Sequence, residues 1–196
     1  MTVLDDRITM AESDNTSHLD EMFERLEKMP VPEGFRVEIV GGTVYMTPQR
    51  NIHWQIIRRI LHRLEDEFGR DAMVLSDVRI DFPGDENAFC PDIALLKDST
   101  EPDESGRWRY RDVAFVAEVI SAGTGPNDYG PKKTAYALAD VSVYLIVDPY
   151  QGRCHLHTQP KDGEYVVETT VAFGADVDMS TTPLGLVLRT GEFPRD

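Results

Sequence analysis

A single acidic residue inside an apolar run places the strongest constraint on how this chain folds. Residues 115–121 read Phe-Val-Ala-Glu-Val-Ile-Ser, and Glu118 is the one charged residue among them. Apolar runs of this length are typical of strands that are buried on both faces. A buried carboxylate is costly unless it is paired or bound to a cation, so Glu118 requires a positive partner. Because side chains alternate along a strand, Glu118 shares its face with Val116 and Ile120.

A second acid stands at the start of another apolar run. Pro91-Asp92 precedes the sequence Ile-Ala-Leu-Leu over residues 93–96, so Asp92 is expected at the rim of the same sheet. An acid after proline is, taken alone, more often an ordinary turn or strand-start residue. Glu118 taken alone could equally pair with a buried arginine or lysine. Neither acid by itself therefore defines a site.

The segment after the Glu118 strand contains a predicted helix over residues 128–139. Asp128, Lys132 and Tyr136 are spaced by four residues, which places them on one helix face. Lys133 points about 100° away from Lys132 on an ideal helix. We therefore expect Lys132 to reach the two acids and form one metal-binding point with them, with Lys133 as the second choice.

The remaining pattern predicts one domain in which helices and strands are mixed. Further helices are predicted over residues 18–28 and 52–68, and strands over 35–40, 43–47, 73–82, 93–96, 114–120, 143–147, 154–158, 165–170 and 184–188. Residues 83–87 and 97–111 are predicted as loops. The elements do not alternate strictly, which indicates an α/β or α+β fold with a mixed sheet. We expect a mobile tail over residues 1–17 and a single domain over residues 18–196.

Composition limits the compartment and the partners. The chain has 196 residues, two cysteines and a formal net charge of −15. No apolar run has the length of a membrane span, and two distant cysteines make no disulfide framework. These features predict a cytoplasmic protein without membrane contact. The acidic charge disfavours tight nonspecific binding of DNA, although a local basic patch or metal ions can still bind it.

The ordered set of motifs resembles the PD-(D/E)XK nuclease superfamily, and more closely the bacterial Uma family of restriction-endonuclease-like proteins. The resemblance extends over residues 18–170. It rests on Glu38 with Gly41-Gly42, His53, Pro91-Asp92, Glu118 to Ser121, Asp128 with Lys132 and Tyr136, and residues 144–149. It implies a restriction-endonuclease-like mixed central sheet flanked by helices.

The resemblance also implies hydrolysis of DNA phosphodiester bonds with Mg²⁺ or Mn²⁺. Asp92 and Glu118 would hold the ion together with the backbone carbonyl of Val119, since hard oxygen ligands suit Mg²⁺. Lys132 would orient the attacking water and offset charge in the transition state. Glu38 would hold that lysine or contribute to a second ion.

One departure from the superfamily pattern keeps other functions open. Ile120 stands where the motif has lysine, and the family supplies the lysine from the following helix. The alternatives are a nuclease-like fold that serves as a binding or regulatory module without cutting, and a metal-dependent hydrolase of a smaller phosphoester. His53 is expected to cap a helix or form a structural hydrogen bond, and a role near the metal is the less favoured alternative. An exposed sheet edge at the hairpin around Asp162-Gly163 favours a homodimer, whose two sites would suit cutting both DNA strands.

Overall fold

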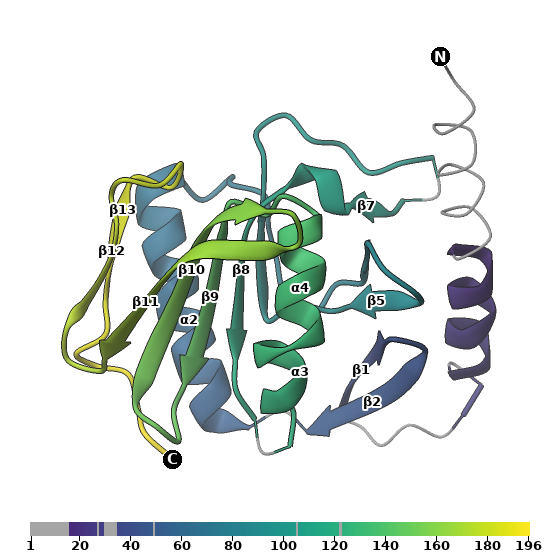
Figure 1. Cartoon of the computed structure of the whole chain (residues 1–196), viewed down its shortest axis with the longest axis horizontal. Coiled ribbons are helices and arrows are strands. Elements are labelled where there is room, and N and C mark those ends of the chain that lie inside the picture. Colours follow the sequence, from purple (N-terminus) through teal and green to yellow (C-terminus); the bar gives the residue numbers. More distant parts are fainter. Residues whose placement is uncertain (1–15, 27, 30–34, 49, 105, 122) are drawn as a thin grey trace.

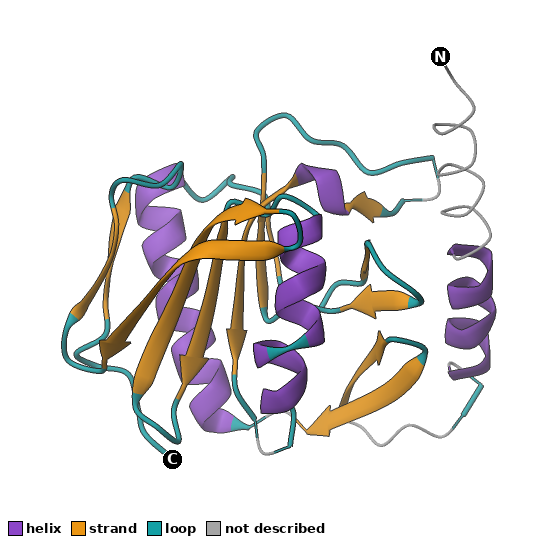
Figure 2. Ribbon diagram, in the orientation of Figure 1, coloured by secondary structure: helices purple, strands orange, loops and turns teal. Residues whose placement is uncertain are grey.

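The computed structural model describes residues 16–26, 28–29, 35–48, 50–104, 106–121 and 123–196. These residues form a mixed α+β fold with a six-stranded sheet, a five-stranded sheet and a two-stranded sheet (Figures 1 and 2). The predicted tail over residues 1–17 lies outside the described ranges except for residues 16 and 17, which are helical. No described helix is long and apolar enough to cross a membrane.

The elements match the predicted order closely. The described helices are residues 16–26, α2 (Asn51–Phe68), α3 (Gly125–Tyr129) and α4 (Pro131–Leu138), with a 3-10 turn η1 (Tyr110–Asp112). The strands are β1 (Phe35–Val40), β2 (Thr43–Pro48), β3 (Val74–Leu75), β4 (Ile80–Phe82), β5 (Asn87–Phe89), β6 (Ile93–Leu96), β7 (Trp108–Arg109), β8 (Val113–Val119), β9 (Val143–Asp148), β10 (Arg153–Lys161), β11 (Glu164–Ala172), β12 (Asp176–Met179) and β13 (Leu186–Arg189). Every predicted strand has a counterpart, and the mixed α+β class is confirmed.

The six-stranded sheet has the order β11-β10-β9-β8-β6-β3. Strands β8 and β9 are parallel, and the other neighbours are antiparallel. Helix α2 and helix α4 lie on opposite faces of this sheet (Figure 1). Phe115 and Val119 of β8 pack in the cluster formed with α2, whereas Val116 and Ile120 pack with α4. Strand alternation therefore turns Glu118 toward α4, as predicted.

The five-stranded sheet has the order β2-β1-β5-β4-β7 and brings a second set of polar residues to the first sheet. Its hairpin β1–β2 turns at Gly41 and Gly42, whose φ angles of 53° and 71° favour glycine. Arg36 and Glu38 alternate with apolar residues on β1, and both are buried. Two residues of one strand thus project from the second sheet into the region beside β8.

Several short elements were not predicted. Strands β5 and β7 lie at the end of the predicted 83–87 loop and within the predicted 97–111 loop, because two or three residues carry too little periodicity to indicate a strand. Strand β13 does not extend a larger sheet but pairs with the unpredicted β12 in a separate sheet. The helix predicted over residues 128–139 is two helices divided at Gly130, since Pro131 disfavours the helical conformation of the residue before it.

Strand β11 forms one edge of the six-stranded sheet, as the sequence predicted for the C-terminal hairpin. Most of its side chains are exposed. Val166 is 62% exposed and Val167 is 38% exposed, so the edge carries apolar surface. An edge of this kind offers unpaired backbone groups to another strand.

The buried His157 on β10 predicts that the stability of the fold depends on pH. Its ring packs on Tyr144, and burial lowers the pKa of His157 to about 4, although Glu168 opposes the shift. Between that value and about 6.5, the unfolded chain binds a proton that the folded chain does not. The free energy of unfolding should therefore decrease as the pH is lowered through this window.

Urea denaturation at pH 7 and pH 5 measures this effect, and His157→Phe should reduce the difference between the two values. His62→Phe is the matched control, because His62 lies exposed on α2. An unchanged pH dependence in His157→Phe would show that other groups are responsible.

Candidate active site

Glu118 lies near the end of β8 and is 1% exposed. Its Oε1 is 2.6 Å from Lys132 Nζ and accepts a 2.6 Å hydrogen bond from the Tyr136 hydroxyl. Its Oε2 accepts a longer bond, 3.4 Å, from the backbone N–H of Asp92 and lies 3.9 Å from Arg36 Nη1. The expectation that the buried glutamate meets a positive charge is thus confirmed.

Asp92 stands directly before β6 and is also buried. Strands β6 and β8 are antiparallel with Ile93 opposite Ala117, so the start of β6 lies beside the end of β8. Asp92 Oδ2 accepts a 2.7 Å hydrogen bond from the backbone N–H of Val119, and Oδ1 lies 2.5 Å from Arg36 Nη1. Strand pairing therefore brings the two acids together, although they are separated by many residues in the sequence.

Lys132 reaches this point from α4 and is completely withdrawn from solvent. Its Nζ lies 3.0 Å from Glu38, 2.6 Å from Glu118 and 3.0 Å from Asp128. An ammonium has three N–H donors, so three carboxylates match its full capacity. Burial disfavours the charge, but Asp128, Glu118 and Glu38 outweigh it and hold the pKa of Lys132 well above its usual range.

Arg36 is the residue that the sequence analysis missed. Its guanidinium lies within 4 Å of Asp92, Glu38, Asp77 and Glu118, at 2.5, 3.6, 3.4 and 3.9 Å. Burial opposes its charge, yet these acids raise the pKa of Arg36. Residues two apart on a strand share a face, so the sequence places Arg36 beside Glu38, but it does not indicate that this face is buried.

Six side chains therefore make up a buried polar centre, which we call the carboxylate cluster: Glu38, Asp92, Glu118 and Asp128 with Arg36 and Lys132. If all six are ionised, four negative charges face two positive charges, and two negative charges are uncompensated. Burial raises the pKa of Glu118 to about 8 and also raises that of Asp128, while Lys132 opposes both shifts. The cluster is thus suited to take up protons or a further cation.

The backbone carbonyl of Val119 is held from α2. His53 is buried there, and its Nε2 contacts the Val119 carbonyl oxygen, which confirms the expected structural hydrogen bond. A cavity of about 10 Å³, close to the size of one water molecule, lies between Arg36, His53 and Asp92. Asp92 and His53 therefore border a small space, and His53 in turn contacts the Val119 carbonyl.

The predicted oxygen ligands fit a hard divalent cation in chemistry and in charge. Asp92, Glu118 and the Val119 carbonyl are oxygen donors of the kind that Mg²⁺ prefers, and the two negative charges left over when all six side chains are ionised equal the charge of one such ion. No three described Cys, His, Asp or Glu side chains are arranged as ligands of one ion, but this set contains only two side chains. Arg36 occupies one oxygen of Asp92, so an ion there would share or displace that contact.

The two neighbouring lysines, Lys132 and Lys133, differ in which residues they contact. Lys133 lies off the cluster and contributes charge near His157 on β10 instead. Lys132 touches Glu118 and Glu38 directly, whereas none of its contacts among the described residues reaches Asp92. Lys132 thus joins the cluster through the glutamates, and Arg36 joins it through Asp92.

A mixed sheet whose paired strands β6 and β8 bring a buried aspartate and glutamate together, with a buried lysine reaching the glutamate from α4, defines a fold of the restriction-endonuclease type. The chain belongs to the Uma2 family, described as "Putative restriction endonuclease", whose model matches residues 20–191. It is also similar to the crystal structure of a "putative nuclease belonging to DUF820" from Anabaena variabilis, with a TM-score of 0.66 and 15% identity. That match covers 89% of this chain and 96% of the other. A search of curated proteins found no match.

The geometry predicts that Lys132 is a main source of stability. In Lys132→Met, three buried carboxylates lose their shared cation, and the free energy of unfolding should fall by about 3–5 kcal/mol. Lys133→Met makes the same chemical change one residue away, outside the cluster, and should cost less than about 1 kcal/mol. Urea denaturation followed by circular dichroism measures both, and equal losses would contradict a special role for Lys132.

Proposed function

We propose that this chain is a metal-dependent endonuclease that hydrolyses phosphodiester bonds in DNA. The observation that carries the proposal is the convergence of Asp92, Glu118 and Lys132 in one buried cluster of a chain that belongs to the Uma2 family. The two free, buried cysteines support a reducing cytoplasm as its compartment.

Asp92, Glu118 and the Val119 carbonyl would hold Mg²⁺ or Mn²⁺, with Glu38 nearby as a further oxygen donor. When bound, such an ion lowers the pKa of a coordinated water and stabilises charge that develops on the phosphate. The raised pKa values of Glu118 and Asp128 support this assignment, because they mark buried carboxylates whose negative charge the cluster does not fully compensate, whereas a dication would.

The side chains of the chain itself would orient the reacting groups. Tyr136 donates to Glu118 and stays protonated, since burial raises its pKa, so it fixes the direction of that carboxylate. The ammonium of Lys132 donates a hydrogen bond to Glu38 and forms ion pairs with Glu118 and Asp128 at 2.6 and 3.0 Å. It would orient a water or phosphate oxygen only by exchanging one of these carboxylates.

A binding or regulatory module without cleavage is the second candidate. Two contacts favour it: Arg36 already neutralises Asp92, and His53 already contacts the carbonyl of Val119. In that case Arg36 and His53 would satisfy the oxygen atoms that a metal ion would otherwise bind. Hydrolysis of a smaller phosphoester is a third candidate, and a substrate panel separates it from the first.

Metal titration and DNA cleavage test the proposal together. Calorimetry with Mn²⁺ should show binding to the unaltered chain and its loss in Asp92→Asn and Glu118→Gln. Cleavage of plasmid and single-stranded DNA should decrease at least about a hundredfold in both variants, since the ion supplies several kcal/mol to the transition state. Asp66→Asn removes an exposed carboxylate of α2 and should change neither readout.

The possible outcomes separate the candidates. Mn²⁺ binding without cleavage of any substrate would favour the binding module, and cleavage restricted to small phosphoesters would favour the third candidate. Undiminished DNA cleavage by Glu118→Gln would show that the active site lies elsewhere.

A homodimer formed through the β11 edge is part of the same proposal. The exposed Val166 and Val167 on this edge support it, because two such edges can pair across a twofold axis. Light scattering should give the mass of a dimer, and Val166→Lys should shift it toward the monomer. Val78→Lys, an exposed apolar position away from β11, is the control. A monomeric mass for the unaltered chain at working concentration would remove the dimer.

A further inference from the structure

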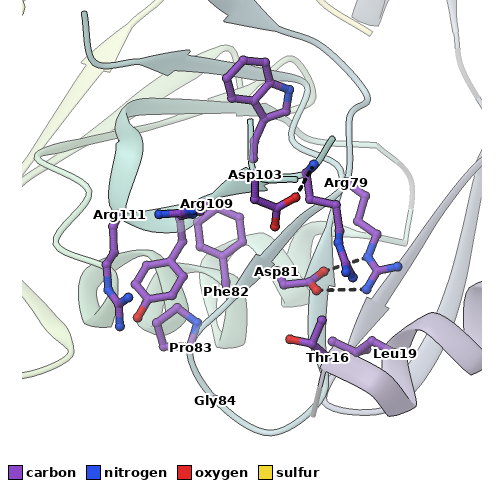
Figure 3. Close-up of a pocket in the computed structure, with 13 residues that line it drawn as sticks. Thr16, Leu19, Arg79, Asp81, Phe82, Pro83, Gly84, Asp103, Arg109 and Arg111 are labelled. Atoms are coloured by element: carbon purple, nitrogen blue, oxygen red, sulfur yellow. Dashed lines mark hydrogen bonds and ion pairs between the residues drawn. The ribbon is translucent and has the colours of Figure 1, made fainter. Parts of the chain in front are cut away.

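A second hollow, apart from the carboxylate cluster, is lined by arginine and aromatic side chains. Its volume is about 460 Å³. Residues 107–111 read Arg-Trp-Arg-Tyr-Arg, and all five line this pocket. Figure 3 shows Arg109 and Arg111 on the side opposite Arg79 and Asp81. Arginines and aromatic residues thus alternate along one wall of the pocket.

Ion pairs fix part of this wall in place. Arg79 forms hydrogen bonds of 2.7 and 2.9 Å to Asp81 and lies 2.9 Å from Asp20. Arg107 binds the same Asp20 at 2.7 and 2.9 Å. The helix over residues 16–26 is thereby tied to β4 and to the segment that enters β7. The pocket has a rigid frame before any ligand arrives.

The pocket has surplus positive charge, although the whole chain has a net charge of −15. Four arginines line it, against Asp81 and Asp103, and Asp20 binds two of these arginines, so one positive charge remains in surplus. Arg109 is exposed, and none of the described residues forms an ion pair or hydrogen bond with its guanidinium. This guanidinium is therefore available to an anionic ligand.

These features together define the ligand class. A guanidinium matches phosphate with two parallel hydrogen bonds, and an aromatic face such as that of Trp108 is a sequence-tolerant platform for a nucleobase, whereas the Arg111 guanidinium already lies 5.0 Å from the centre of the Tyr110 ring. The volume lies in the range of small-ligand pockets. We infer that this pocket binds a nucleoside phosphate, with its phosphate on Arg109 and its base against the aromatic wall.

The pocket also adjoins the carboxylate cluster. Phe82 lines it, and the Phe82 ring packs edge-on against Tyr136 with a centroid distance of 4.8 Å. Asp77, which contacts Arg36, is two residues from Arg79, or at most ~7 Å along the chain. A single DNA strand that placed one nucleotide in the pocket would therefore lie near the cluster. The choice of a DNA strand as the source rests on the proposed nuclease function, whereas binding itself does not require cleavage.

Tryptophan fluorescence tests the inference directly. The chain has two tryptophans, so in Trp54→Phe the signal comes from Trp108 alone. The variant is titrated in EDTA with a short oligothymidylate, with thymidine monophosphate, with thymidine and with inorganic phosphate. We expect the first two to quench Trp108, and thymidine and phosphate to bind at least about tenfold more weakly, because each lacks one of the two recognised groups.

Matched variants show where the ligand binds. Added to Trp54→Phe, Arg109→Gln should weaken binding at least about tenfold, whereas Arg58→Gln on the exposed face of α2 should not. An oligonucleotide at least tenfold tighter than the monophosphate identifies a strand as the source, and equal affinities identify the free nucleotide. No quenching by either ligand, or equal binding by both arginine variants, would overturn the inference.

The same variants separate this inference from the nuclease proposal. Glu118→Gln should retain binding in the pocket, because Glu118 does not line it. Binding without any cleavage would refute the nuclease function and leave the pocket assignment intact. DNA cleavage without any quenching of Trp108 fluorescence would support the nuclease function and refute the pocket assignment.

Discussion

The ion pair between Lys132 and Glu118 is the interaction on which the rest of the structure depends. Burying an ammonium costs several kcal/mol, and this cost is offset only if its partners are close and well oriented. Glu38 comes from β1 of the five-stranded sheet, Glu118 from β8 of the six-stranded sheet, and Asp128 from α3. The lysine therefore connects both sheets and the helical layer through one atom. Any displacement of these elements leaves buried charge uncompensated, so the polar centre that would perform chemistry also holds the fold together.

The cluster is divided between two cations. Lys132 binds the three carboxylates on the α4 side, and Arg36 binds Asp92 on the side that borders the small cavity. Arg36 and Lys132 together supply two positive charges against four carboxylates, so full ionisation leaves two negative charges that neither cation balances. A dication can do so, but it must compete with Arg36 for an oxygen of Asp92. If the proposed ion binds, its access to Asp92 would depend on how firmly Arg36 is held, and Asp77 contributes to that hold from the solvent side.

Much of this arrangement could be predicted from local periodicity. The two-residue alternation of side chains along β8 placed Glu118 on the face shared with Val116 and Ile120. The four-residue spacing of Asp128, Lys132 and Tyr136 placed these three on one side, from which Lys132 was expected to reach Glu118. Arg36 could not be recognised in the same way, because polar residues that alternate with apolar ones usually mark a solvent-facing strand. Only the packing of one sheet against the other buries it. Strands β5 and β7 were missed for a related reason, since their pairing depends on distant partners rather than on their own sequence.

Charge distribution links the cluster to the pocket. A net charge of −15 repels nucleic acid, but at physiological salt this repulsion is largely screened beyond a Debye length of about 8 Å. Arg36 and Lys132 are buried among acids and cannot attract a phosphate from solution. Residues 107–111, by contrast, concentrate arginines at an open pocket. If a DNA strand is the substrate, its first contact is therefore expected at this pocket, and the repulsive surface elsewhere would suppress binding in other positions. An acidic nuclease can in this way favour one orientation of a strand without a broadly basic surface.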